Sequence, residues 1–131
     1  MDRTQRIRIS KNGKTLFRDI ELASSYRERM KGLSGRRELG CGGLLFVFPR
    51  EAKHSIWMPN MKFAIDIVFI GREKRVVDIK CCARPISANP KTWRIFRPKD
   101  KALYVLELPA NHTKTLLKEG DALDFDIPKP K

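Results

Sequence analysis

The chain is poor in cysteine and has no residue spacing typical of a metal site. Its three cysteines are Cys41, Cys81 and Cys82, an odd number, and neighbours in sequence rarely bridge each other. A secreted disulfide framework is therefore not expected. No C-x-x-C pair occurs, and adjacent strand residues point to opposite faces, so Cys81 and Cys82 are poorly placed to hold one ion. We predict no metal, no cofactor, and core or rim positions for the cysteines.

The chain also lacks a long apolar run and a targeting signal. Its longest apolar runs, residues 42–48 and 64–70, are far shorter than the roughly 20 residues that cross a bilayer. The N-terminal sequence MDRTQRIRIS contains no apolar centre followed by a small-residue cleavage site. These absences predict a cytoplasmic protein that does not enter a membrane.

Acidic residues are few relative to basic ones. The chain has 28 Lys and Arg against 15 Asp and Glu, which gives a formal net charge of +13. The excess is concentrated, because residues 1–37 carry 11 basic and 4 acidic side chains and residues 71–101 carry 10 and 3. Such a balance favours contact with polyanions but does not determine the fold.

The composition is that of a globular domain. The 131 residues are 41% hydrophobic and 33% charged, which suits one domain of about 100 to 150 residues with a single core. We expect residues 1–131 to form a single domain, with its core in residues 5–127 and an exposed tail at residues 128–131.

Short apolar segments with a preference for strands dominate the pattern. Apolar and polar side chains alternate in residues 5–22 on the way to Asn12 and Gly13, a pair that suits a tight hairpin turn. Residues 65–83 predict a second hairpin. Further strands are expected at residues 44–48, 54–58, 102–108 and 121–127, and a long loop at residues 84–100. Because strands and helices do not alternate, the pattern predicts a mainly β fold, an antiparallel β-sandwich or barrel.

Two short helices complete the expected fold. In residues 24–32, Ser25 can cap the helix, Glu28 follows three residues later as in a capping box, and Gly32 can end it in a left-handed conformation. Residues 111–120 predict the second helix, which Gly120 ends.

Six segments, taken in order, resemble the family known as domain of unknown function 192. They are RMKGL, GGLLFVFP, SIWMPN, IDIVFI, YVLEL and GD, and they extend from about Arg29 to Asp121. The resemblance implies a compact, jelly-roll-like β fold with no established activity. The family pattern falls on Gly32, Leu33, Gly43, Phe46, Phe48, Trp57, Met58, Asn60, Asp66, Phe69, Tyr104, Glu107 and Gly120.

The chain departs from that pattern at four positions. Pro59 stands where the family usually has a basic residue, and Ser34 and Leu44 stand where methionines are usual. Asn111 replaces a glycine, and asparagine can still adopt the left-handed conformation that such a glycine serves.

Two carboxylates, Asp66 and Glu107, stand on strands that are otherwise apolar. A buried carboxylate must be paired, hydrogen-bonded or protonated. One interpretation is an acid–base pair in a pocket, as in a small hydrolase or lyase. The other, which we favour, is structural: Asp66 caps a loop through backbone N–H groups, and Glu107 pairs with Arg29 or Lys31.

Trp57 and Asn60 raise the same choice. The indole and the amide can orient a ligand, although core packing and a turn are the more common roles of such residues. Our preferred functional hypothesis is a small non-enzymatic binding or accessory domain. Its cleft would lie near Trp57, Asn60, Asp66 and Glu107 and take a small polar ligand or a partner loop.

The basic stretch at residues 72–101 supports an alternative function. It mixes basic and aromatic side chains, as does a surface that follows a nucleic-acid backbone and stacks bases. The candidate residues for nucleic-acid binding are Arg72, Lys74, Arg75, Lys91, Trp93, Arg94, Arg97 and Lys99. The simpler interpretation is a solvated basic surface, because no recognised RNA or DNA motif is present.

Overall fold

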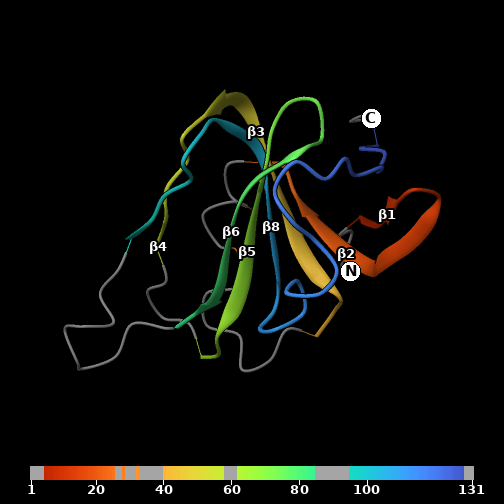
Figure 1. Ribbon diagram of the computed structural model, residues 1–131, viewed down its shortest axis with the longest axis horizontal. Coiled ribbons are helices and arrows are strands. Elements are labelled where there is room, and N and C mark those ends of the chain that lie inside the picture. Colours follow the sequence, from red (N-terminus) through yellow and green to blue (C-terminus); the bar gives the residue numbers. More distant parts are fainter. Residues whose placement is uncertain are drawn as a thin grey trace.

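The structure, a computed structural model, describes residues 5–25, 28, 32, 40–57, 62–84 and 95–128, with the backbone alone for Trp57. Eight β-strands lie within these residues (Figure 1). They are β1 (Arg6–Lys11), β2 (Lys14–Ala23), β3 (Gly43–Ala52), β4 (Ile56–Trp57), β5 (Ile65–Ile70), β6 (Val76–Ala83), β7 (Ile95–Phe96) and β8 (Ala102–Pro109). In this part of the chain, no helix has the length and apolar character needed to cross a membrane.

Six of the strands form one sheet in the order β1-β2-β3-β8-β5-β6, and β4 pairs with β7 in a small second sheet. All of these pairs are antiparallel except β2 with β3, which is parallel. The predicted mainly β fold is therefore confirmed, with a mixed rather than wholly antiparallel main sheet. A parallel pair needs a connection of a dozen or more residues, and residues 24–42 supply it.

A glycine allows β3 to begin beside β2. The N–H of Gly42 donates a hydrogen bond to the carbonyl oxygen of Asp19 at 2.9 Å. A Cβ atom at Gly42 would lie 1.8 Å from the carbonyl oxygen of Arg18, so any other residue would force the two strands apart. The parallel pair thus depends on a position without a side chain.

Both hairpins lie where the sequence predicts them. Asn12 and Gly13 join β1 to β2 with φ values of 52° and 78°, as a primed turn requires. Gly71 and Lys74 belong to the turn between β5 and β6, where the N–H of Lys74 donates to the carbonyl oxygen of Gly71 at 2.9 Å. In both cases the turn residues decide the pairing because they act locally.

The capping box predicted near residue 25 is present. The N–H of Glu28 donates to Oγ of Ser25 at 3.1 Å, and the N–H of Ser25 donates to Oε1 of Glu28 at 3.0 Å. Gly32 adopts the predicted left-handed conformation, with φ of 47°, and its N–H donates to the carbonyl oxygen of Glu28. The helix residues between these positions lie outside the described residues.

The second predicted helix, at residues 111–120, is wrong: the segment is a series of turns. The N–H groups of Leu116 and Leu117 both donate to the carbonyl oxygen of Thr113 at 3.0 Å, but the pattern does not continue, and the N–H of Gly120 donates to the distant carbonyl oxygen of Val76 at 2.8 Å. Residues 121–127 make isolated bridges rather than the predicted strand, although burial still alternates along them. The predicted loop at residues 84–100 contains the short strand β7.

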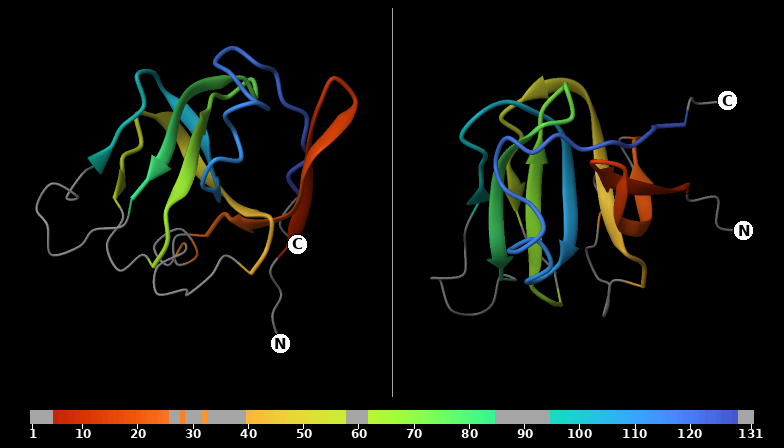
Figure 2. Two further views of the ribbon diagram at one scale, coloured as in Figure 1. Left: turned by 60° about the horizontal axis from the view of Figure 1, so that its bottom comes forward. Right: turned by 45° about the vertical axis from the view of Figure 1, so that its right-hand side comes forward.

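The main sheet has two apolar faces, which we call the first and the second face. The first is defined by buried side chains that include Ile20, Leu45, Val68, Leu106 and Leu108. Leu117, Leu123 and Phe125 of the C-terminal segment, residues 110–128, pack on it. Figures 1 and 2 show this segment, in blue, running from the end of β8 past the β5–β6 turn to the β1–β2 hairpin.

The second face carries a separate apolar cluster. Its buried members include Ala23, Leu44, Phe46, Ile67 and Val105. Ile56 of β4 and Phe96 of β7 pack against it, so the small sheet covers this side of the main sheet. The molecule therefore has three layers: the C-terminal segment, the main sheet and the small sheet.

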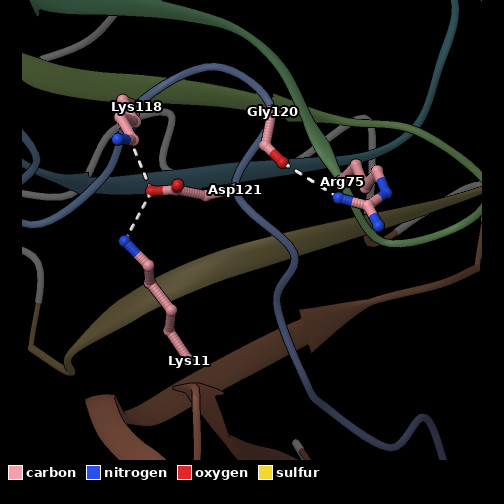
Figure 3. A network of polar contacts seen from close by, with 5 residues as sticks. All are labelled: Lys11, Arg75, Lys118, Gly120 and Asp121. Carbon is pink, nitrogen blue, oxygen red and sulfur yellow. Dashed lines mark hydrogen bonds and ion pairs between the residues drawn. The ribbon is translucent and has the colours of Figure 1, made fainter.

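An ion-pair network fastens the C-terminal segment (Figure 3). Oδ2 of Asp121 accepts hydrogen bonds from Nζ of Lys11 at 2.8 Å and from the N–H of Lys118 at 2.9 Å. The Lys11 bond is the main cause that holds the pKa of Asp121 below its ordinary value. Nearby, the Arg75 guanidinium donates to the carbonyl oxygen of Gly120 at 3.1 Å. The Lys11–Asp121 and Arg75–Gly120 contacts join the C-terminal segment to the two hairpin turns of the main sheet.

Candidate functional site

The two carboxylates predicted as a site lie on opposite faces of the main sheet. In the pairing of β5 with β8, Asp66 stands opposite Leu108 and Glu107 stands opposite Ile67. Paired residues share a face, and Leu108 belongs to the first face while Ile67 belongs to the second. Asp66 and Glu107 therefore do not meet in one pocket.

Asp66 is completely buried and surrounded by hydrogen-bond donors. Its carboxylate accepts backbone N–H groups from Cys82, Asn111, His112 and Thr113 at 2.9–3.1 Å, and the Thr113 hydroxyl at 2.9 Å. Burial by itself raises the pKa of Asp66, but these hydrogen bonds outweigh it and lower the pKa below the ordinary value. Asp66 thus caps the loop that follows β8, which is the structural role considered from the sequence.

Glu107 is 4% exposed and lies in a different environment. Its neighbours across the strands are Leu44 of β3 and Ile67 of β5, both apolar and buried. Burial raises the pKa of Glu107 to about 8, so the group is protonated at neutral pH. The predicted partners Arg29 and Lys31 lie outside the described residues.

A second buried carboxyl group, that of Glu21, lies in the row of paired residues that crosses the sheet through Glu107. Glu21 of β2 pairs with Leu44 of β3, and Leu44 pairs with Glu107 of β8, so Glu21 and Glu107 share the second face. They are two strands apart, or roughly 10 Å at the usual strand spacing. Glu21 is 7% exposed. Sequence reasoning missed it because only the parallel β2–β3 pairing places it in this row.

The strand that contains Trp57 lies on the same side of the sheet as Glu107. Ile56 precedes Trp57 in β4 and packs against the cluster of the second face. Phe48 of that cluster stacks on the His54 ring, with centroids 3.7 Å apart and planes at 11°. Asn60 lies outside the described residues. The structure therefore brings Glu107 and the strand of Trp57 to one side and leaves Asp66 on the other.

The described basic residues of the stretch 72–101 that were predicted to bind nucleic acid make contacts within the chain itself. The Lys74 ammonium lies 4.8 Å from the centroid of the Phe125 ring and also donates to a backbone carbonyl. The side chain of Arg75 contacts Gly120, that of Lys99 contacts Glu119, and that of Arg97 contacts Ser55. The backbone N–H of Arg72 donates to Glu51. Lys91, Trp93 and Arg94 lie outside the described residues.

An open cleft of about 440 Å³ adjoins the β5–β6 turn, and it carries both signs of charge. Its charged lining consists of Arg72, Arg75, Lys101, Glu51, Glu73 and Asp100. A surface that follows a phosphate backbone carries predominantly positive charge. This cleft therefore does not form a basic groove.

The cysteines agree only in part with their predicted core or rim positions. Cys41 is half-buried, and its thiol donates to the carbonyl oxygen of Gly43 at 3.2 Å, but Cys81 and Cys82 are both exposed. The described residues contain no group of three or more His, Cys, Asp or Glu placed to hold a metal ion.

These features define a class: a small mixed-β domain with a structural carboxylate on one face of its sheet and a protonated, buried one on the other. The chain belongs to the DUF192 family, described as "Uncharacterized ACR", whose model matches residues 7–125. The resemblance found in the sequence is thereby confirmed.

Relatives of known sequence carry the family name UPF0127. The protein from Thermococcus gammatolerans is 34% identical over 91% of this chain and 74% of its own length. The protein from Pyrococcus furiosus is 31% identical over 87% of this chain and 92% of its own length.

Two crystal structures have the same fold. A protein from Sinorhizobium meliloti, described as a candidate transcription regulator, is 28% identical with a TM-score of 0.74, covering 93% of both chains. A protein of unknown function from Novosphingobium aromaticivorans is 28% identical with a TM-score of 0.77, covering 92% of this chain and 84% of that one.

Proposed function

We propose that this protein is a small, non-enzymatic binding domain whose ligand contacts Glu107 on the second face of the sheet. The observation that carries the proposal is a carboxyl group, 4% exposed, that stands between apolar cross-strand neighbours and has a pKa raised to about 8. A buried carboxyl group among apolar neighbours is costly to ionise, and acidic groups with a strongly raised pKa are found more often at functional sites. A cationic ligand would offset the cost of ionising Glu107.

The chemistry of Glu107 indicates the class of ligand. A small molecule with an ammonium or guanidinium group would pair with the ionised carboxylate, and its other donors could reach Glu21 in the same row. Trp57 and Asn60 remain in the proposal as candidate ligand contacts, on the sequence argument alone. Asp66 does not, because its oxygens already accept five hydrogen bonds.

The proposal predicts how binding depends on pH. A cationic ligand pairs with the ionised form, so the affinity should rise with pH until about 8, the pKa of Glu107 in the free protein, and then level off. Below that pH, binding should release about one proton per ligand.

The test is a thermal-shift screen of small amines and guanidinium compounds in an inorganic buffer. We expect compounds that raise the melting temperature of the wild type but not of Glu107→Gln, which keeps the shape of the protonated side chain. Glu73→Gln, at an exposed turn residue, is the matched control and should respond like the wild type. Equal stabilisation of Glu107→Gln by every active compound, or no active compound at millimolar concentration, would contradict the proposal.

Nucleic-acid binding is the second candidate. It is supported by the net charge of +13 and by the description of the Sinorhizobium relative as a candidate transcription regulator. If it is correct, the affinity for oligonucleotides should fall steeply with rising salt. Fluorescence anisotropy between about 50 and 200 mM salt, with Arg97→Ala and Lys99→Ala compared with the wild type, tests this candidate. Weak binding without salt dependence would remove it.

The geometry does not favour the third candidate, a hydrolase or lyase in which Asp66 and Glu107 act on one substrate, because the sheet separates them. Within the proposal we assign the protein to the cytoplasm. The support for this assignment is that all three cysteines are free thiols.

A further inference from the structure

An irregularity in the β5–β6 pairing changes the positions of the two neighbouring cysteines. Ile65 pairs with Ala83 and Ile67 pairs with Lys80, so the single residue Asp66 stands opposite both Cys81 and Cys82. This is a β-bulge, which inserts one extra residue into a strand. The bulge overturns the expectation that adjacent side chains of this strand point to opposite faces.

Both thiols contact the same loop after β8. Sγ of Cys82 donates to Oδ1 of Asn111 at 3.0 Å, and Sγ of Cys81 lies 3.6 Å from Oγ1 of Thr113. Both cysteines are exposed, and β6 is an edge strand of the main sheet. The two sulfur atoms are therefore on one side of the strand and open to solvent.

The buried Asp66 carboxylate fixes this geometry. It accepts the N–H of Cys82 at 2.9 Å and also the N–H groups of Asn111 and Thr113, which carry the partners of the two thiols. Cys82 and Asn111 have φ values of 54° and 68°, a conformation that a non-glycine residue keeps only where its surroundings hold it. The strand and the loop are thus locked together around the dithiol.

We propose that Cys81 and Cys82 form a vicinal dithiol site that chelates a soft, thiophilic centre such as trivalent arsenic. Two sulfur ligands on one side of a strand suit such a centre, because soft ions prefer thiolates to oxygen ligands. The site is independent of the second face and of Glu107. Its first coordination sphere needs no third protein ligand, because an organoarsenical supplies the remaining bond.

The chemistry of binding is balanced without a change of oxidation state. With phenylarsine oxide, each thiol loses its proton and forms one As–S bond, while the As–O bonds break. The two protons and the oxygen leave as one water molecule. The arsenic atom keeps its phenyl group and remains trivalent.

The test uses the full chain, reduced and freed of reductant, titrated with phenylarsine oxide in a tenfold excess of a monothiol. Mass spectrometry should show one arsenic per chain, and a dithiol such as dithiothreitol should remove it. Cys81→Ser and Cys82→Ser should each weaken binding about a hundredfold or more, because the second As–S bond is then no longer intramolecular. Cys41→Ser is the matched control and should bind like the wild type.

A comparison of folded and unfolded protein tests the role of the bulge. The wild type should retain arsenic at monothiol concentrations about ten times higher when it is folded than when it is unfolded in urea. Melting curves show whether each serine variant is folded. Equal retention in both states, binding that survives Cys82→Ser, or binding that requires Cys41 would overturn the proposal. Glu107→Gln should leave arsenic binding unchanged, so the two proposals can fail separately.

Discussion

Asp66 and Glu107 lie on neighbouring strands of one sheet, and both are almost completely buried, at 0% and 4% exposure. Their pKa values nevertheless move in opposite directions: that of Asp66 is lowered, and that of Glu107 is raised to about 8. The difference lies in what surrounds them, because Asp66 accepts five hydrogen bonds whereas apolar side chains flank Glu107. Burial therefore does not decide the charge of a carboxyl group in this sheet; the donors directed at it do.

The same difference separates the roles of the two faces. The C-terminal segment packs over the first face, and the Asp66 carboxylate on that face accepts hydrogen bonds from the segment. The second face holds a buried, protonated acid between apolar neighbours. We therefore expect substitutions on the first face to change the free energy of unfolding, and substitutions on the second to change ligand binding and the response to pH.

The largest effect is expected for Asp66→Ala. The variant leaves backbone N–H groups of Cys82, Asn111 and Thr113 without their acceptor, and each buried orphan donor costs about 1–3 kcal/mol. We expect a loss of at least about 3 kcal/mol in the free energy of unfolding, measured by urea denaturation. Asp66→Asn, which retains one acceptor oxygen, should lose less. A loss under about 1 kcal/mol for Asp66→Ala would mean that the loop does not depend on this carboxylate.

A smaller, pH-dependent effect is expected from Glu107. Its pKa is about 8 in the folded protein against an ordinary 4.5, so between these values the folded state binds one proton more than the unfolded state. The free energy of unfolding should therefore fall as pH rises from about 4.5 to about 8, by a few kcal/mol in total, and then level off. Denaturation at a series of pH values should show this fall in the wild type.

In Glu107→Gln the fall should be absent, because glutamine does not titrate. Asp66 makes the opposite contribution: its lowered pKa stabilises the protein above the ordinary Asp range, and that stabilisation is lost as the pH falls through the folded-state value. If Glu107→Gln shows the same dependence as the wild type between pH 4.5 and 8, Glu107 is not the group responsible.

The smallest effect is expected at Asn111, which holds a φ of 68° in the loop that Asp66 caps. Alanine there should cost about 1–2 kcal/mol, because a Cβ atom disfavours the left-handed conformation and alanine lacks the amide that such residues use locally. Asn111→Gly is the matched control and should remain within a few tenths of a kcal/mol of the wild type. Equal losses for the two variants would assign the effect to the lost contact with Cys82 rather than to the backbone.

Local features could be predicted because neighbouring residues produce them. The Asn12-Gly13 turn and the Ser25–Glu28 capping box each need only residues close in sequence, and both are present. The helix predicted at residues 111–120 is reduced to turns around the Thr113 carbonyl, because other groups compete for the backbone that follows. The N–H of Gly120 bonds to Val76, and that of Lys118 bonds to the Asp121 side chain rather than to a preceding carbonyl.

The candidate site shows the same division. Alternation along each strand correctly set Asp66 and Glu107 among apolar neighbours, but it could not relate one strand to the other. The register of β5 against β8, with Ile67 opposite Glu107, places the two carboxylates on opposite faces. The bulge at Cys81 and Cys82 was also beyond prediction, because it appears only when two strands are paired and one has an extra residue.

The sequence by itself determined the mainly β class, the two hairpins, the family, and the burial of Asp66 and Glu107, because periodicity and turn chemistry act over a few residues. Only the tertiary structure decided which donors reach each carboxyl group, which face each one occupies, and that two neighbouring thiols point the same way. The physical reason is that pKa values and strand register depend on groups far apart in the chain, such as Asp66 and the N–H groups of residues 111–113.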